Sequence, residues 1–284
     1  MEKPQSSQSG QIVLISLLVL SIAITVALSL ISRSTTDVAI SNQITESSRA
    51  FSAAEAGIEE ALKTGAGTAV AQVLTAGVSY TVAKTDIGGA SGAYVFPKKV
   101  SSGSTETLWL VNHNADGTLV ETPTYTSSGI DVCWSEESAT ATLPALSVAV
   151  VYKTPAGAYR VAKGAYDPDS TRRLTNAFSG VTSLTGGCGA DTGTTIKQTI
   201  SFADFTPAIN PVLDTILMLL ISPVYADSRL AVNATGALPL QGSRIQSTGT
   251  TTTGLTRKIV VYQQYRSPPS VFDWVIYSQG SFGH

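Results

Sequence analysis

Residues 12–31 read IVLISLLVLSIAITVALSLI and contain no charged residue, no glycine and no proline. A helix rises about 1.5 Å per residue, so this run is long enough to cross the roughly 30 Å hydrocarbon core of a bilayer. A cleaved secretory signal is the competing interpretation, but its apolar region usually has only about 7 to 15 residues. We therefore expect an uncleaved, single-pass transmembrane helix over residues 12–31. Its orientation is not fixed by the flanking charges, because basic and acidic residues occur together on both sides.

The helical pattern continues beyond the membrane segment. Apolar residues recur at steps of three, four and seven, which keeps them on one face of a helix. Lys63, followed by Gly65, is typical of the end of a helix. We therefore expect one helix over residues 11–64, apolar all round in its first half and amphipathic in its second half, where an apolar stripe packs against a globular domain. The stripe consists of Ile40, Ile44, Phe51, Ala54, Ile58 and Leu62.

The composition of the 284 residues excludes several classes of function. Charged residues make up only 13%, about half the usual share in a soluble domain, and 18 basic against 20 acidic residues give a net charge of -2. Such a chain lacks the basic face of a nucleic-acid-binding protein. Two histidines and two cysteines are too few for a zinc finger, a His-rich metal site or an iron–sulfur cluster. We expect no cofactor and no nucleic-acid partner.

After residue 67 the apolar residues recur at steps of two, as they do in half-buried strands. Turn signals such as Gly88-Gly89 and Asp167-Pro168-Asp169 separate these segments. Many short strands at hairpin spacing predict an antiparallel sheet or sandwich. The predicted fold is therefore α+β, a long N-terminal helix packed on an antiparallel β-rich head over residues 65–205, with a C-terminal β region over residues 228–284. The alternating segments are Val78-Tyr80-Val82, Ile130-Val132-Trp134, Tyr159-Val161 and Leu230-Val232, and Leu146 to Tyr152 and Lys258 to Tyr262 are expected as central strands.

Residues 206–227 form an apolar segment with three prolines. Within it, residues 212–222 read VLDTILMLLIS, which is too short to span a bilayer without tilting or thinning. We expect a buried core helix or strand here. The prolines also make the whole segment a candidate hinge between a larger sheet unit and a smaller one.

Two short motifs in the N-terminal region resemble a known family. Ser9-Gly10-Gln11 precedes the apolar run, and Ala50-Phe51-Ser52-Ala53-Ala54-Glu55-Ala56-Gly57-Ile58 lies on the amphipathic half of the helix. Together they resemble the N-terminal module of type IV pilin-like minor pilins of the PilX type, over about residues 4–65. The second motif has a simpler alternative interpretation as a small-residue face, which any closely packed helix can use.

The resemblance implies processing, partners and an assembly surface. A prepilin peptidase would remove the leader, residues 1–10, by cutting between Gly10 and Gln11, and Gln11 would become an N-methylated terminus. Other pilin subunits, an inner-membrane platform and an assembly ATPase are the further implied partners. The helix would serve first as a membrane anchor and then as a packing element of a filament core. Its implied assembly residues are Ile15, Phe51, Ala54, Glu55, Gly57 and Ile58.

Ile15 departs from the pattern of major pilins, most of which carry an acid at the fifth mature position. This departure puts ordinary subunit docking in doubt and favours a minor or tip subunit. We expect a non-enzymatic protein of this kind, held in the membrane with its head outside the cytoplasm and assembled into or at the tip of a surface filament. The alternative is a single-span, membrane-anchored surface protein or adhesin whose head binds an extracellular ligand and never enters a filament.

The residues that could support catalysis or metal binding are sparse. His113 lies in a polar turn without a nucleophile motif, which predicts a solvated turn histidine and no catalytic triad. Asp167 and Asp169 could ligate calcium, but no EF-type loop surrounds them, so an Asp-Pro turn beside basic residues is the simpler interpretation. We therefore assign no catalytic residue and no metal site.

Cys133 and Cys188 are the only thiols, and both lie in the part expected outside the cytoplasm. An even number of cysteines in an exported domain favours one disulfide, which would close a loop of about 55 residues. Free structural thiols are the alternative, since the sequence does not show whether the two Cα atoms come within about 7 Å.

Overall fold

The computed structural model describes residues 9–114, 116–135 and 142–268. The chain folds into two units, and the boundary between them falls inside three long strands, β2, β11 and β12. The first unit comprises Met1–Lys84 and Ile245–Val261, and the second comprises Thr85–Arg244 and Tyr262–His284. Each unit therefore combines segments that are far apart in the sequence.

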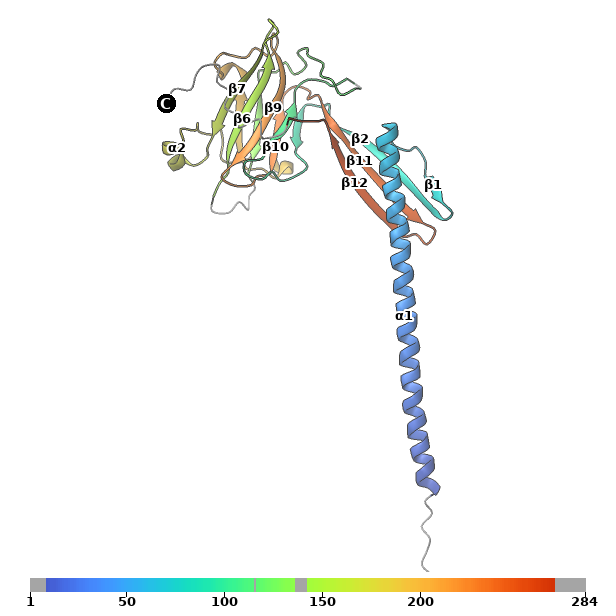
Figure 1. The fold of residues 1–284 in the computed structure, drawn as a ribbon. Coiled ribbons are helices and arrows are strands. Elements are labelled where there is room, and N and C mark those ends of the chain that lie inside the picture. Colours follow the sequence, from blue (N-terminus) through green and yellow to red (C-terminus); the bar gives the residue numbers. More distant parts are fainter. Residues whose placement is uncertain (1–8, 115, 136–141, 269–284) are drawn as a thin grey trace, which may run out of the picture. The chain divides into compact units, whose positions relative to one another are not determined.

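The first unit consists of one long helix and one four-stranded sheet. Helix α1, Ser9–Thr64, agrees closely with the helix predicted from the apolar run and its continuation. The sheet has the strand order β1-β2-β11-β12, and the C-terminal half of α1 lies against it (Figure 1). This arrangement confirms the predicted α+β fold, in which a long N-terminal helix packs on antiparallel strands. The strands are β1 Gln72–Thr75, β2 Val78–Gly88, β11 Leu240–Thr251 and β12 Thr256–Gln264.

The second unit contains two four-stranded antiparallel sheets, with strand orders β3-β10-β5-β8 and β4-β9-β6-β7. The first consists of β3 Gly92–Val95, β10 Leu230–Ala234, β5 Gly129–Trp134 and β8 Ile196–Ser201. The second consists of β4 Glu106–Trp109, β9 Thr215–Val224, β6 Ala145–Lys153 and β7 Tyr159–Tyr166. Three short helices lie in the connections, α2 Ser170–Asn176, η1 Ala190–Thr192 and η2 Phe202–Asp204.

The two sheets of the second unit share one hydrophobic core, to which both contribute alternate side chains. Trp134, Tyr125 and Phe202 are the largest side chains that are fully buried in it. Their polar atoms keep hydrogen-bond partners, since Trp134 Nε1 donates to the Pro144 carbonyl at 2.7 Å and the Tyr125 hydroxyl donates to the Gly129 carbonyl at 2.9 Å. The second unit is therefore a β-sandwich, one of the two architectures that the strand spacing predicted.

The predicted hinge over residues 206–227 is wrong. The structure places β9 there, in the interior of a sheet, where it pairs with β4 on one side and with β6 on the other. Its side chains are buried on both faces, which explains the unbroken apolar run. Pro223 is accommodated near the end of the strand. The core-strand interpretation of this segment is correct, and the division between units lies elsewhere.

Two strands of the first unit differ from their sequence patterns. The run ending at Tyr262 lies in β12, an edge strand and not a central one. Ile259 and Val261 pack against the cluster beneath α1, whereas Val260 on the opposite face is exposed. The neighbouring strand β11 was not predicted, because most of its alternating buried positions hold Gln, Ser, Gly and Thr in place of large apolar residues.

Candidate functional site

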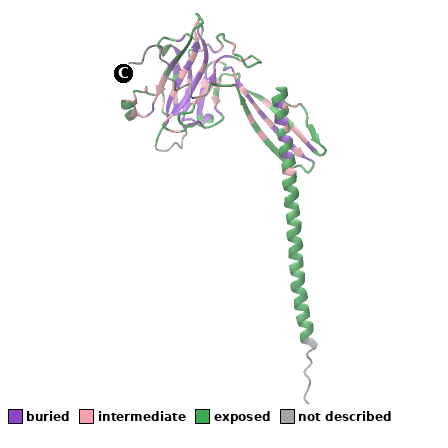
Figure 2. Ribbon diagram, viewed as in Figure 1, coloured by how far each residue is buried: buried purple, intermediate pink, exposed green. Residues whose placement is uncertain are grey.

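The first half of α1 is apolar and exposed on every side. Residues 11–44 are all exposed, so Figure 2 shows this part of the helix without a buried face. The helix passes the length and hydropathy criteria for a membrane span, with a mean hydropathy of 2.8 in its most apolar window and none of that window buried. An isolated helix of this composition needs an apolar environment, which a bilayer or a bundle of similar helices supplies.

Two polar side chains within the apolar half, Ser21 and Thr25, find hydrogen-bond partners in the helix itself. The Ser21 hydroxyl donates to the Leu18 carbonyl at 2.8 Å, and the Thr25 hydroxyl donates to the Ile22 carbonyl at 2.8 Å. A hydroxyl that bonds back to the preceding turn needs no water. Ser21 and Thr25 therefore add little to the free-energy cost of transferring the helix from water into lipid.

The second half of α1 contacts its sheet through small residues. Ala50, Ala53 and Ala54 are fully buried, and Gly57 and Ala61 continue the same face one and two helical turns later. Across from them, β11 presents Gly249, where an added Cβ would collide with the Ala50 carbonyl and lie 2.7 Å from the Ala54 amide nitrogen. Gly57 is equally enclosed, because a Cβ there would collide with the Ser247 hydroxyl of β11 and lie 2.8 Å from the Tyr80 ring of β2. The helix backbone and the sheet backbone are thus in close contact.

The predicted apolar stripe is therefore wrong in part. Ala54 and Ile58 face the sheet, but Phe51 and Leu62 are each 47% exposed, and Ile40 and Ile44 lie before the sheet begins to cover the helix. The large side chains are excluded because the helix approaches the strands too closely to admit them. The signal in the sequence was the Ala/Gly spacing of Ala50-Phe51-Ser52-Ala53-Ala54-Glu55-Ala56-Gly57, whose interpretation as a close-packing face the structure supports.

Polar contacts fix the helix where the sheet begins to cover it. Glu46 and Arg49 form an ion pair at 2.8 Å, and Arg49 also donates to the Ala76 carbonyl in the β1–β2 turn. In the β11–β12 hairpin, Thr253 donates to Glu46, and Arg257 of β12 donates to the Ser47 hydroxyl at 2.8 Å. The Thr251 hydroxyl, with Arg49 and Thr253, holds the pKa of Glu46 below its usual value. These contacts define the register of the helix on the sheet.

The expected assembly residues fall into two groups. Ala54, Gly57 and Ile58 are used within the unit, whereas Ile15, Phe51 and Glu55 remain exposed. Helix α1 begins at Ser9, so the bond between Gly10 and Gln11, the expected cleavage site, lies in its first turn. The preceding leader residues lie outside the described residues. Phe51 is thus a large apolar side chain that the packing of α1 on its own sheet leaves partly exposed.

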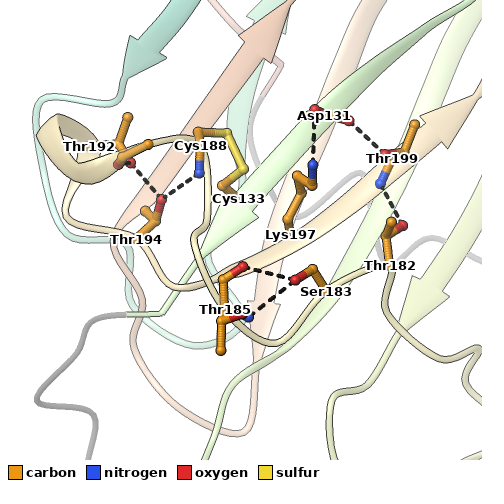
Figure 3. Close-up of a disulfide and its surroundings, with 11 residues drawn as sticks. Asp131, Cys133, Thr182, Ser183, Thr185, Cys188, Thr192, Thr194, Lys197 and Thr199 are labelled. Atoms are coloured by element: carbon orange, nitrogen blue, oxygen red, sulfur yellow. Dashed lines mark hydrogen bonds and ion pairs between the residues drawn. A yellow bond between two sulfur atoms is a disulfide. The ribbon is translucent and has the colours of Figure 1, made fainter.

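Cys133 and Cys188 form a disulfide, with their Cα atoms 5.6 Å apart (Figure 3). Cys133 is fully buried in β5, and Cys188 belongs to the loop that connects residue 180 to β8. The Cys188 amide and the Thr192 hydroxyl both contact the Thr194 hydroxyl, which closes the loop on itself. The pairing expected from the cysteine count is the pairing in the structure, and it ties this loop to the core of the sandwich.

Asp167 and Asp169 are both engaged by protein groups. The buried Asp167 carboxylate receives hydrogen bonds from the Arg172 guanidinium, at 2.7 and 3.1 Å, and from the Asn176 amide at 2.8 Å. Burial alone would raise the pKa of Asp167, but these donors outweigh it and lower the pKa. Asp169 caps the N-terminus of α2 by accepting from the Thr171 amide. Within the described residues no group of three or more metal-ligating side chains occurs, and the calcium interpretation has no support in this geometry.

His113 is not the solvated turn histidine that its sequence context predicted. Its ring stacks on Tyr265 with a centroid distance of 3.8 Å and meets the edge of Trp109 at 4.7 Å. Burial among these rings lowers the pKa of His113, so the neutral imidazole is favoured. Tyr265 is distant in sequence, which is why the local pattern gave no sign of the stack.

A search of protein families, curated proteins and solved structures finds no match to this chain. The functional argument therefore depends on the residues and geometry described above.

Proposed function

We propose that the protein is a non-enzymatic minor subunit of a type IV pilus-like filament, anchored in a membrane by α1 before assembly and placed at few positions or at the tip. The observation that supports the proposal is the division of α1 into two halves with different surroundings. One continuous helix has an exposed apolar half that can cross a bilayer and a second half fixed to a folded unit by close backbone packing.

The energetics of the apolar half favour membrane insertion. Residues 12–31 include fourteen Leu, Ile and Val side chains. At about 0.3 to 0.6 kcal/mol each near the centre of a bilayer, they contribute roughly 4 to 8 kcal/mol to insertion. The same surface can pack against equivalent helices when the chain leaves the lipid, so one segment serves both states.

Ile15 supports the minor or tip position within this proposal. A mature N-terminal amine carried into an apolar helical core is a buried charge, which is costly unless an opposite charge accompanies it. In family members with an acid at the fifth mature position, that carboxylate can meet the amine of a neighbour. The apolar Ile15 offers a neighbour no such partner, so a homopolymer of this chain is unfavourable, whereas its own amine can still pair with an acid on another subunit.

The experiment is quantitative mass spectrometry of filaments sheared from cells, beside the membrane fraction of the same cells. The protein should be present in the filaments at low abundance relative to an acid-bearing major subunit, and expression without that subunit should leave it in the membrane. Complete absence from sheared filaments, with all of the protein in the membrane, would favour an anchored surface protein or adhesin. Filaments made of this chain alone would contradict the role assigned to Ile15.

A further inference from the structure

Tyr225 lies in the connection between β9 and β10 and has an unfavourable backbone conformation. Its φ angle is 75°, in the left-handed region that favours glycine. Among the residues that the structure describes, Ser135 and Ala177 are the other non-glycine residues with a positive φ. Both are small, and Ala177 is the C-cap of α2, a usual place for this conformation. A bulky residue in this region persists only where its surroundings hold it, and such residues cluster at binding sites.

The surroundings of Tyr225 fix its ring. The Arg172 guanidinium lies over the ring at 4.6 Å from its centroid, and the Asn176 amide donates to the Tyr225 hydroxyl at 3.2 Å. Arg172 is itself held in place, because it donates to the buried Asp167 carboxylate at 2.7 and 3.1 Å and to the Leu143 carbonyl at 2.7 Å. The strained tyrosine is thus held by side chains that are in turn anchored to the sandwich.

These contacts leave a large part of the tyrosine in solvent. Tyr225 is 47% exposed, and because the guanidinium covers one face of the ring, the opposite face is the open one. The neighbouring surface is charged. The Asp169 side chain is 41% exposed, and one of its carboxylate oxygens lies 3.8 Å from Arg172 Nε. An aromatic plane beside a guanidinium and a carboxylate is therefore presented to the solvent.

We propose that Tyr225 is the stacking platform of a carbohydrate-binding site. A pyranose ring lies flat on the open face of the tyrosine, and Arg172 and Asp169 bond to its hydroxyl groups. The C–H groups on one side of a pyranose form an apolar surface that suits the electron-rich face of an aromatic ring. Its hydroxyls both donate and accept, so they suit a carboxylate acceptor and a guanidinium donor.

The chemistry beside the ring favours a sugar over an apolar partner. An apolar partner would cover Arg172 and Asp169 without offering them hydrogen bonds, which is costly for charged groups. A tyrosine that is already fixed loses little conformational entropy when it binds, so the backbone strain is compensated by preorganisation of the site. The proposal does not depend on filament assembly.

The test is saturation-transfer NMR of the full-length protein in a detergent without a sugar head group. The probes are methyl β-D-glucopyranoside, methyl β-D-galactopyranoside and N-acetylglucosamine. At least one of them should give a saturable signal, and Tyr225→Gly should lower the affinity for it about tenfold. Tyr225→Phe keeps the ring and should keep most of the affinity. Glycine adopts a positive φ without strain, so Tyr225→Gly should not lower the melting temperature.

Tyr159→Ala is the matched control. Tyr159 is also exposed, at 58%, and Lys153 Nζ lies 5.5 Å from its ring centroid, but it belongs to the regular strand β7. This variant should bind the sugar as the wild type does. A saturable signal from none of the three probes would overturn the proposal, and so would equal losses of affinity in Tyr159→Ala and Tyr225→Gly. A lower melting temperature of Tyr225→Gly would also overturn it, because the strained tyrosine would then serve the stability of the fold.

Discussion

Gly249→Ala is the sharpest perturbation of the contact between α1 and its sheet. The new methyl group would collide with the Ala50 carbonyl and lie 2.7 Å from the Ala54 amide nitrogen, so it meets backbone atoms that cannot rotate away. The helix must move off the strand or the strand must bend. Overpacking of this kind typically costs about 1 to 3 kcal/mol. We therefore expect the protection of α1 over residues 50–61 against local opening to fall by that amount.

Hydrogen exchange of the full-length protein in detergent measures this loss locally. A decrease of about 1 to 3 kcal/mol corresponds to roughly 5-fold to 150-fold faster exchange of amides that open with the helix–sheet contact. The amides of the apolar half serve as an internal reference and should not change. Thr250→Val, on the opposite face of the same strand, is the control for strand propensity. If Gly249→Ala exchanges like the wild type over residues 50–61, the close backbone contact is not what holds the helix.

The remaining predictions concern single residues. Cys188→Ser should destabilise the second unit by roughly 2 to 5 kcal/mol, and wild-type protein unfolded without reductant should show no titratable thiol from Cys133 or Cys188. Ser247→Ala should stabilise the first unit by about 1 kcal/mol in thermal unfolding, because the buried Ser247 hydroxyl has no hydrogen-bond partner among the described residues. The pKa of Asp167 is lowered in the folded state, so the ionised carboxylate stabilises the fold above the unfolded pKa of about 3.9, and this stabilisation is lost as the pH falls through the folded pKa. Asp167→Asn should therefore lower the melting temperature at pH 7 and weaken the acid destabilisation below about pH 4. Ile15→Glu should raise the ratio of this protein to the major subunit in sheared filaments, and an unchanged ratio would mean that the residue does not limit incorporation.

The parts of the fold that the sequence predicted are those with strong local patterns. The apolar run over residues 12–31 and its polar continuation define α1 without tertiary information, because length and periodicity are local properties. The dense apolar run from Leu146 to Tyr152 likewise becomes β6 in the interior of a sheet. In both cases the large apolar side chains themselves mark the buried surface.

The parts that were missed depend on close approach or on distant residues. Strand β11 lacks the alternating large apolar residues from which a strand is predicted. Its buried face lies beneath a helix backbone, where Gly249 and Ser247 fit and a leucine would not. The prediction that Phe51 packs against the sheet was wrong for the same reason, because the close approach of helix and sheet leaves no room for a large side chain. The environment of His113 requires Tyr265, which only the tertiary fold brings to it. A local sequence pattern cannot predict such contacts, because the contacting residue lies far away in the sequence.

The most direct test of the proposed function is the intact mass of the mature protein isolated from its native membrane. We predict a chain that begins at Gln11, carries the added mass of one methyl group on its terminal amine and lacks residues 1–10. Replacing Gly10 by Leu should leave the leader attached, because a peptidase pocket shaped for glycine excludes a larger side chain next to the cut. A wild-type chain that retains Met1, or that begins at any residue other than Gln11, would contradict the assignment to a pilin-like filament.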